Sequence, residues 1–375
     1  MGKIAVFVLA TLLMAPAAFG RDFKVHPGQS IQDAIDSAHP GDTVIVYPGT
    51  YREAGSPCPS QPSSTCAVVV SKKNITLTAK STAKKPVIIK NHSGMKAGIT
   101  VAASGVNSHT CLNDSTHRID GSSIQGFTVT GFSIGFLLVC VDNWDLGSDI
   151  ADDDDDYGFF PSHSGSGRLH DSTASGANDT GIYVGQSHDV RIDHDVATNN
   201  VSGFEIENST SIVADHNEAH GNTAGMLMFI VPNLDTNMSE DNRIVHNSVH
   251  DNNRSNTCDP GDLVCDVPSG SGIIVVSGMD NVVSHNNVAR NHSLGVALLS
   301  ACTAFNIAPV ECNGLSYAKP ESTRITDNDV THNGLDPGSS PFQPADLIWD
   351  GTGTGNCWEG NTNGATTVPP NLPRC

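Results

Sequence analysis

Arginine, aspartate and histidine recur together at matching positions along the middle of the chain. Arg191-Ile192-Asp193-His194 is followed by Val213-Ala214-Asp215-His216 and by Arg243-Ile244-Val245-His246. A guanidinium pairs with a carboxylate, and histidine or aspartate can accept or donate a proton. The combination indicates a site that binds a uronate chain and moves the proton at its C5 carbon. The candidate catalytic residues are Arg191, Asp193, His194, Asp215 and His216, and the candidate substrate-binding residues are Arg168, His170, Tyr183, Arg243 and His246.

We call nine of these ten residues, all except Tyr183, the polar strip. The strip also has an interpretation that needs no chemistry, because a repeating chain stacks similar side chains whether or not they react. Histidine is tolerated in turns, so a column of histidines can arise from stacking alone. Short motif matches carry a high risk of false positives. Both interpretations stay open on the sequence.

An acidic run at residues 152–156 is a second candidate site. Carboxylates at this density can hold Ca²⁺, which takes six to eight oxygen ligands. The run lacks the alternating spacing of an EF-hand loop, and a solvated acidic bulge is the alternative because blocks of like charge usually stay exposed. The candidate calcium ligands are Asp152, Asp153, Asp154, Asp155 and Asp156.

The elements that must position these residues follow from an internal repeat. A pattern of an apolar residue, two polar residues, Asn or Asp, any residue and a small apolar residue recurs along the chain. Its register marks lie at residues 127, 149, 172, 195, 217, 247, 286 and 328, with spacings of 22, 23, 23, 22, 30, 39 and 42. Near-equal steps followed by longer ones indicate one coil of about 22 residues plus insertions, the size of one turn of a parallel β-helix.

Stacked coils turn each repeat position into a column. One column stays small and apolar from Val129 to Val330, and a second runs from Ile124 to Ile325. A polar column lies at a turn, where we expect the side chains to hydrogen-bond to each other and to take left-handed backbone angles. That column contains Asp195, Asn217, Asn247, Asn286 and Asn328.

A second strand in each coil begins at a glycine, as in Gly181-Ile182-Tyr183-Val184. Alternate residues of this strand must face the core, which predicts that Phe159 and Phe204 are buried and that Tyr183 points outward. We expect the insertions near residues 231–240, 253–270, 300–322 and 334–344.

The whole mature chain is expected to be one β-helix domain over residues 21–375. We place an N-terminal cap at about 22–52, with a short helix over 30–38 that covers the open end and has Ser30 as its N-cap. Regular coils follow at about 120–230, insertion-bearing coils at about 231–345, and a stapled tail at 346–375.

The start of the chain and its cysteines predict export. Residues 1–20 read as a signal peptide, with Lys3 before an apolar run too short to span a membrane. Ten cysteines fit an oxidising compartment, and their spacing favours disulfides over zinc. Sequence cannot prove connectivity, and we expect nearest-neighbour pairs. The pairs are Cys58 with Cys66, Cys111 with Cys140, Cys258 with Cys265, Cys302 with Cys312, and Cys357 with Cys375.

Charge narrows the class of partner. The formal net charge is -20, which argues against nucleic acid, because phosphate binding needs a basic face. We expect a monomer without a transmembrane anchor, secreted, periplasmic or on the cell surface, with an acidic polysaccharide as partner.

Two groups of segments carry a family resemblance. Residues 27–35 and 48–51 resemble the opening of pectin-lyase-like β-helix proteins. Residues 157–161, 181–187 and 349–358 are similar to a bacterial group of exported parallel β-helix repeat proteins. The resemblance implies a right-handed parallel β-helix. The superfamily includes polysaccharide lyases, epimerases and glycosidases, and some of its lyases use Ca²⁺. We therefore expect a lyase or epimerase on an acidic polysaccharide, or alternatively a non-catalytic binding or surface protein.

Overall fold

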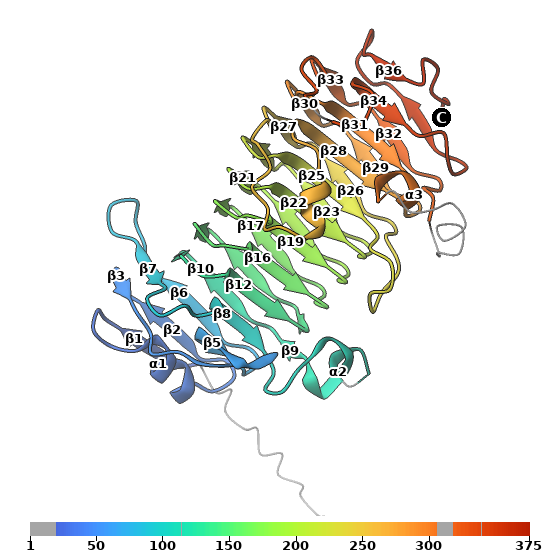
Figure 1. The fold of residues 1–375 in the computed structure, drawn as a ribbon. Coiled ribbons are helices and arrows are strands. Elements are labelled where there is room, and N and C mark those ends of the chain that lie inside the picture. The colour runs from blue at the N-terminus through green and yellow to red at the C-terminus, as the bar shows by residue number, and fades with distance from the viewer. Residues whose placement is uncertain (1–19, 114, 306–317, 339) are drawn as a thin grey trace, which may run out of the picture.

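Three parallel β-sheets run the length of the molecule and form a right-handed parallel β-helix (Figure 1). The computed structural model describes residues 20–113, 115–305, 318–338 and 340–375. Most of the predicted signal segment therefore lies outside the described residues. Among the described residues, no helix has the length and apolar character needed to cross a membrane.

Each complete coil contributes one strand to each sheet. Sheet A contains β1 (Asp22–Val25), β2 (Thr43–Val46), β6 (Thr76–Ala79), β10 (Ser123–Gln125), β14 (Asp145–Gly147), β17 (Arg168–His170), β20 (Arg191–Asp193), β23 (Val213–Asp215), β26 (Arg243–Val245), β29 (Val282–Ser284), β32 (Arg324–Thr326) and β35 (Cys357–Glu359). Sheet B contains β3 (Gly49–Tyr51), β7 (Val87–Lys90), β11 (Phe127–Thr130), β15 (Ile150–Asp152), β18 (Thr173–Ser175), β21 (Val196–Thr198), β24 (Glu218–His220), β27 (Ser248–His250), β30 (Asn287–Ala289) and β33 (Asp329–Thr331).

Sheet C carries the longer, glycine-led strands. It contains β4 (Ser56–Cys58), β5 (Gln61–Val70), β8 (Ala97–Ala102), β12 (Ile134–Val139), β16 (Tyr157–Ser162), β19 (Thr180–Gly185), β22 (Ser202–Glu207), β25 (Ala224–Phe229), β28 (Ser271–Val276), β31 (Leu294–Leu299), β34 (Ala345–Trp349) and β36 (Thr367–Val368). A small additional sheet pairs β9 (Ile119–Asp120) with β13 (Val141–Asp142). The helical segments are α1 (Ile31–Ser37), α2 (Ser108–Asn113), η1 (Ser115–His117), η2 (Leu263–Asp266) and α3 (Ala301–Ala304).

The register of the strands confirms the repeat. In sheet A, Ile192 pairs with Ala214 and Ala214 with Ile244, as the predicted column requires. In sheet B, Ala197 pairs with Ala219 in the same way. Both columns are buried along their length, because they face the interior of the solenoid. Phe159 and Phe204 are buried in this core, as predicted.

From Asn217 to Asn328 the polar column forms a continuous ladder inside the solenoid. The side-chain oxygen of Asn247 accepts hydrogen bonds from the backbone N–H of Asn217 (2.8 Å) and from its side-chain amide (3.0 Å), and Asn286 repeats this toward Asn247. The left-handed angles, however, were predicted at the wrong residues. They belong to the preceding position, with φ of 57° at His216 and 56° at His246. The chain changes direction at the residue before the asparagine, so the asparagine side chain points inward and is buried.

Asp195 occupies the ladder position before Asn217 and leaves it incomplete. Its Oδ1 accepts from the backbone of Ser172, whereas its buried Oδ2 has no partner. Burial raises the pKa of Asp195 well above its ordinary value, so folding favours the protonated form of this carboxyl. An asparagine amide would instead donate along the ladder.

We therefore expect Asp195→Asn to stabilise the protein by about 1–3 kcal/mol at pH 7 and by less at pH 4. Urea unfolding at the two pH values measures the difference. An equal or lower stability at pH 7 would contradict the prediction.

The ends and loops are fastened as predicted. In α1, the Ser30 hydroxyl accepts from the backbone of Asp33 (3.1 Å), and the helix covers the first coils (Figure 1). Four disulfides join the expected partners, Cys58–Cys66, Cys111–Cys140, Cys258–Cys265 and Cys357–Cys375. The fifth predicted pair includes Cys312, which lies outside the described residues.

Candidate active site

A groove lies on the outer face of sheet C, where the insertions rise beside the strands. Phe204 and Ile206 face the core, so the alternating Glu205 and Glu207 of β22 point outward. In the next coils the corresponding outward residues are Leu227 and Phe229 of β25, then Ile274 and Val276 of β28. Two glutamates thus interrupt an otherwise apolar face.

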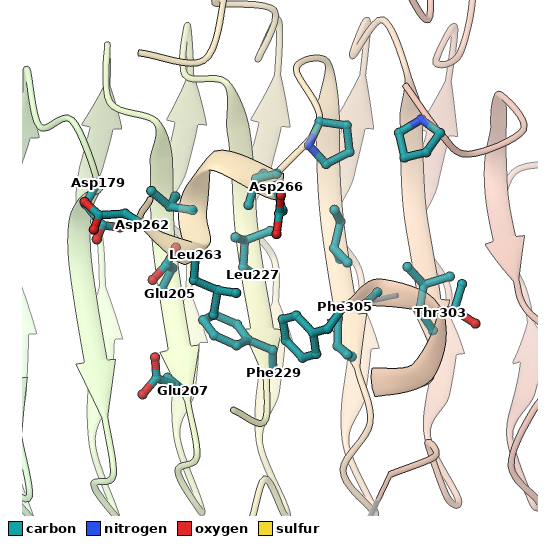
Figure 2. A pocket seen from close by; sticks show the side chains of 18 of the residues that line it. Asp179, Glu205, Glu207, Leu227, Phe229, Asp262, Leu263, Asp266, Thr303 and Phe305 are labelled. Atoms are coloured by element: carbon teal, nitrogen blue, oxygen red, sulfur yellow. The ribbon is translucent and has the colours of Figure 1, made fainter. Parts of the chain in front are cut away.

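The loop carrying η2 and the helix α3 wall this groove (Figure 2). The cavity has a volume of about 880 Å³ and two chemically different ends. The acidic end contains Tyr157, Asp179, Glu205, Glu207 and Asp262, whereas Asp266 lies farther along the groove, beyond Leu227. The apolar end contains Leu227, Phe229, Leu263, Val264, Val267, Pro268, Ile274, Val276, Leu299, Ala304, Phe305, Pro341 and Phe342. No lysine, arginine or histidine lines the described part of the groove.

Burial sets the protonation of the carboxyls at the acidic end. Glu205 is 5% exposed, and burial raises its pKa well above the ordinary value, with a further increase from the charge of Asp179. Burial also raises the pKa of Asp179. It raises the pKa of Glu207 to about 7, although the Tyr183 hydroxyl opposes the shift by donating to Oε1 of Glu207 over 3.0 Å. Burial thus favours the protonated form of Glu205, and Glu207 titrates near pH 7.

An aromatic cluster supports these carboxyls. Tyr183 is 5% exposed, and its ring stacks on Phe160 with centroids 4.4 Å apart. Tyr157 packs edge-on against Phe160, with ring centroids 4.6 Å apart. Tyr183 lies on the outer face, as its alternation with buried neighbours predicts, but it contacts Glu207 and not the polar strip.

The shifted pKa of Glu207 predicts a stability that depends on pH. Between about pH 4.5 and 7, the unfolded chain has released a proton that folded Glu207 still holds. The free energy of unfolding therefore falls as pH rises through this window, by at most about 3 kcal/mol. Glu207→Gln removes this contribution, so its unfolding free energy should fall less than that of the wild type between pH 4.5 and 7.5. Urea titrations at both pH values test this, and parallel losses in both proteins would refute it.

The structure brings most of the polar strip together on sheet A, on a different face from the groove. Asp193 is 1% exposed and accepts two hydrogen bonds from Arg168, at 2.8 and 2.6 Å, and one from Arg191 at 3.0 Å. Arg191 also bonds to Asp215. These guanidiniums hold the pKa of Asp193 well below its ordinary value, although burial opposes them. Both arginines are thus engaged within the protein.

The other members of the strip are more open. His194, His216 and His246 are about half exposed, and their rings stack at centroid distances of 5.4 and 4.9 Å. The Nδ1 atom of His170 lies 2.8 Å from a carboxylate oxygen of Asp171, and its Nε2 atom lies 3.3 Å from a carboxylate oxygen of Asp145. Arg243 is exposed at the start of β26.

The acidic run does not converge on one point. Asp154 is buried and accepts from the backbone of Phe132, whereas Asp156 pairs with Lys96 at 3.0 Å. Asp152 accepts from the Ser175 hydroxyl. Of the five residues, Asp155 and Asp156 come close to a third carboxylate, Asp259 of the loop before η2. Calcium binding here stays a prediction.

Sequence reasoning missed Glu205, Glu207 and Asp179. A usable signal was present: two glutamates occupy outward positions that carry leucine, isoleucine, phenylalanine or valine in the following coils. What remained invisible was the loop that covers them, since it comes from residues more than fifty positions later in the chain.

Comparison with known proteins identifies the family of this chain. A family model described as periplasmic copper-binding protein (NosD) matches residues 60–264, more than half of the chain. The chain belongs to the NosD family. A search of curated proteins found no match for this NosD-family chain.

Solved structures share the fold of this NosD-family protein at low sequence identity. The mannuronan C-5 epimerase AlgE4 A-module of Azotobacter vinelandii is 17% identical, with a TM-score of 0.57 over 88% of this chain and 89% of that one. The periplasmic alginate epimerase AlgG is 15% identical, with a TM-score of 0.56 over 91% and 84%. A lidless DFA-IIIase of Arthrobacter chlorophenolicus is 10% identical, with a TM-score of 0.55 over 90% and 94%. These likenesses confirm the pectin-lyase-like β-helix fold.

Proposed function

We propose that this protein is an exported carbohydrate-active β-helix protein that hydrolyses a polysaccharide in the groove over sheet C. The observation that carries the proposal is the pair Glu205 and Glu207, two carboxyls with raised pKa values at one end of a walled cavity. Export is supported by the disulfides, and polysaccharide as a substrate class is supported by the structural neighbours, which act on such chains.

The two glutamates divide the work of acid and base. Glu205, held protonated, would donate to the glycosidic oxygen, while Glu207, which ionises near neutral pH, would deprotonate a water. The water oxygen bonds to the anomeric carbon as the bond to the leaving oxygen breaks. The proton from water goes to Glu207, and the proton of Glu205 goes to the leaving sugar.

The spacing along β22 fits this division. The Cα atoms of residues i and i+2 of a strand are about 6.6 Å apart, and their side chains point to the same face. Inverting glycosidases separate their two carboxyls by roughly 6.5–9.5 Å, which leaves room for the attacking water. We therefore expect hydrolysis with inversion at the anomeric carbon.

The groove favours a neutral or cationic sugar. The described lining contains five carboxyl groups and no cation, so a uronate carboxylate would meet negative charge and no partner. Apolar faces of sugar rings could instead pack on Phe229 and Phe305, which face the cavity in Figure 2. We therefore keep polysaccharide as the substrate class of the groove, but not the acidic polysaccharide that the sequence predicts.

A second candidate function is action on an acidic polysaccharide that binds at the polar strip. Its support is the alignment of Arg191, Asp193 and Asp215 on neighbouring strands of sheet A. There the protein would act as a lyase or epimerase on a uronate chain. The ion pairs of Arg168 and Arg191 would have to open before either guanidinium could bind the sugar carboxylate.

One screen distinguishes these functions. Purified protein would be offered neutral glycans, chitosan, pectate, alginate and glycosaminoglycans, with Ca²⁺ and with chelator. New reducing ends without ultraviolet absorbance would support hydrolysis in the groove, whereas unsaturated uronates would support a lyase at the strip. C5 inversion seen by proton NMR would support an epimerase. Binding without any product would favour the non-catalytic alternative.

The family description names copper, and the chain offers donors of a suitable kind. Copper(II) is held well by imidazole. The described chain contains no free cysteine, so its soft or borderline donors are mainly histidines, several of which stack beside sheet A. The residues fit such an ion, which they would hold through ring nitrogens.

A further inference from the structure

Four histidines occupy one corner in consecutive coils, between sheets A and B. We call His194, His216, His246 and His285 the histidine column. Each has a left-handed backbone, with φ between 56° and 60°. Other coils meet the same requirement with Gly126, Ser148, Asp171 and Asp327, residues without imidazole. The backbone therefore explains the turn but does not require histidine in four successive coils.

Asp215 lies at the centre of this column. Its Oδ1 is 2.7 Å from Nδ1 of His216 and 3.0 Å from Nδ1 of His246. One ligand atom from each residue can be chosen so that all three lie within 4.8 Å of one another. Two imidazoles from different coils thus converge on one carboxylate oxygen.

We propose that Asp215, His216 and His246 bind one divalent transition-metal ion of the copper or zinc type. The proposal goes beyond the groove and does not depend on its activity. Two imidazole nitrogens and a carboxylate oxygen are ligands that such ions prefer, whereas Ca²⁺ and Mg²⁺ favour oxygen alone. Both histidine side chains are about half exposed, so an ion can reach them from solvent.

The distances fit the proposed coordination. Metal–nitrogen and metal–oxygen bonds of this class are about 2.0–2.2 Å long. Two such ligands at a right angle are about 2.9 Å apart, and at the tetrahedral angle about 3.4 Å apart. The observed oxygen–nitrogen distances of 2.7 and 3.0 Å are those of hydrogen bonds, and they show that the three ligand atoms are close enough to be drawn onto one ion. Copper(II) is the ion of choice for the test, because imidazole holds it well.

Arg191 completes the arrangement by orienting the carboxylate. It donates to Oδ2 of Asp215, the oxygen that faces away from the two imidazoles, and leaves Oδ1 for the ion. Such outer contacts fix the orientation of a metal ligand.

The test measures binding of copper(II) to the full mature chain after chelator treatment. Isothermal titration and electron paramagnetic resonance would be recorded for the wild type, His216→Asn, His246→Asn and the double variant. Asparagine keeps the left-handed backbone, so the coils should stay intact. The matched control is His332→Asn, an exposed histidine with φ of 60° outside the column.

We expect one copper(II) per chain in the wild type, with nitrogen splitting from imidazole ligands. Each single variant should bind at least tenfold more weakly, the double variant should lose the site, and the control should match the wild type. Zinc(II) should compete and Ca²⁺ should not. Wild-type affinity in the double variant, or equal loss in the control, would overturn the proposal, as would a wild type that binds no copper(II). Circular dichroism and thermal melting confirm that every variant is folded.

Discussion

Glu207→Gln should lower the turnover number for the polysaccharide that the protein hydrolyses by about 10²–10⁴-fold, while the Michaelis constant changes little. The amide has the size of the acid but cannot accept the proton of the attacking water, and general-base catalysis contributes about this factor. Because Gln removes no bulk, the groove and its contact with Tyr183 should persist. Initial rates of reducing-end release measure the effect.

The matched control for this variant is Glu359→Gln, an exposed glutamate of β35 on sheet A. It should retain the wild-type rate. The wild-type profile of the turnover number against pH should rise through about pH 7, where Glu207 ionises, and this rise should be absent in Glu207→Gln. A variant that keeps more than a tenth of the wild-type rate would remove Glu207 from the mechanism.

Asn247→Ala should lower the free energy of unfolding by about 4 kcal/mol. The side chain is 2% exposed and makes four hydrogen bonds: its oxygen accepts two from Asn217, and its amide donates to the carbonyl of Ala214 and to Asn286. Alanine leaves several of these buried partners unsatisfied, and each costs about 1–3 kcal/mol. It also opens a cavity beside the core.

Chemical denaturation of the mature chain measures this loss. Asn237→Ala is the control, because Asn237 is exposed in the loop after β25 and its replacement should change stability by no more than about 0.5 kcal/mol. Similar stabilities for the two variants would show that the ladder contributes little. Unfolding in a solenoid can begin locally, so hydrogen exchange of the adjacent strands would show whether the damage stays near Asn247.

The repeat by itself determines the scaffold. A spacing of 22 or 23 residues predicts one coil, and alternation along each strand assigns Ile192, Ala214 and Phe204 to the core. These features are local and periodic, so each coil repeats the information of its neighbours. The cysteine spacing worked for the same reason, since each described disulfide closes a short stretch of chain.

The conformation of the corner was less accessible from the pattern. Asparagine is common in left-handed turns, so the pattern predicts those angles for the column containing Asn217 and Asn247. The structure gives them to His216 and His246 and turns the asparagines inward, because an internal amide can satisfy the backbone of two coils at once. Only the stacking of coils makes that inward position favourable.

The sequence by itself determined the β-helix, its columns, its terminal helix and the alignment of the polar strip on sheet A. Only the tertiary structure decided that Arg168 and Arg191 are paired with buried Asp193, and that Glu205, Glu207 and Asp179 share a groove. The physical reason is the separation along the chain between the residues that determine each property. Registers follow from a period, whereas burial and pKa depend on which distant segment covers a side chain, and here that segment includes η2 and α3.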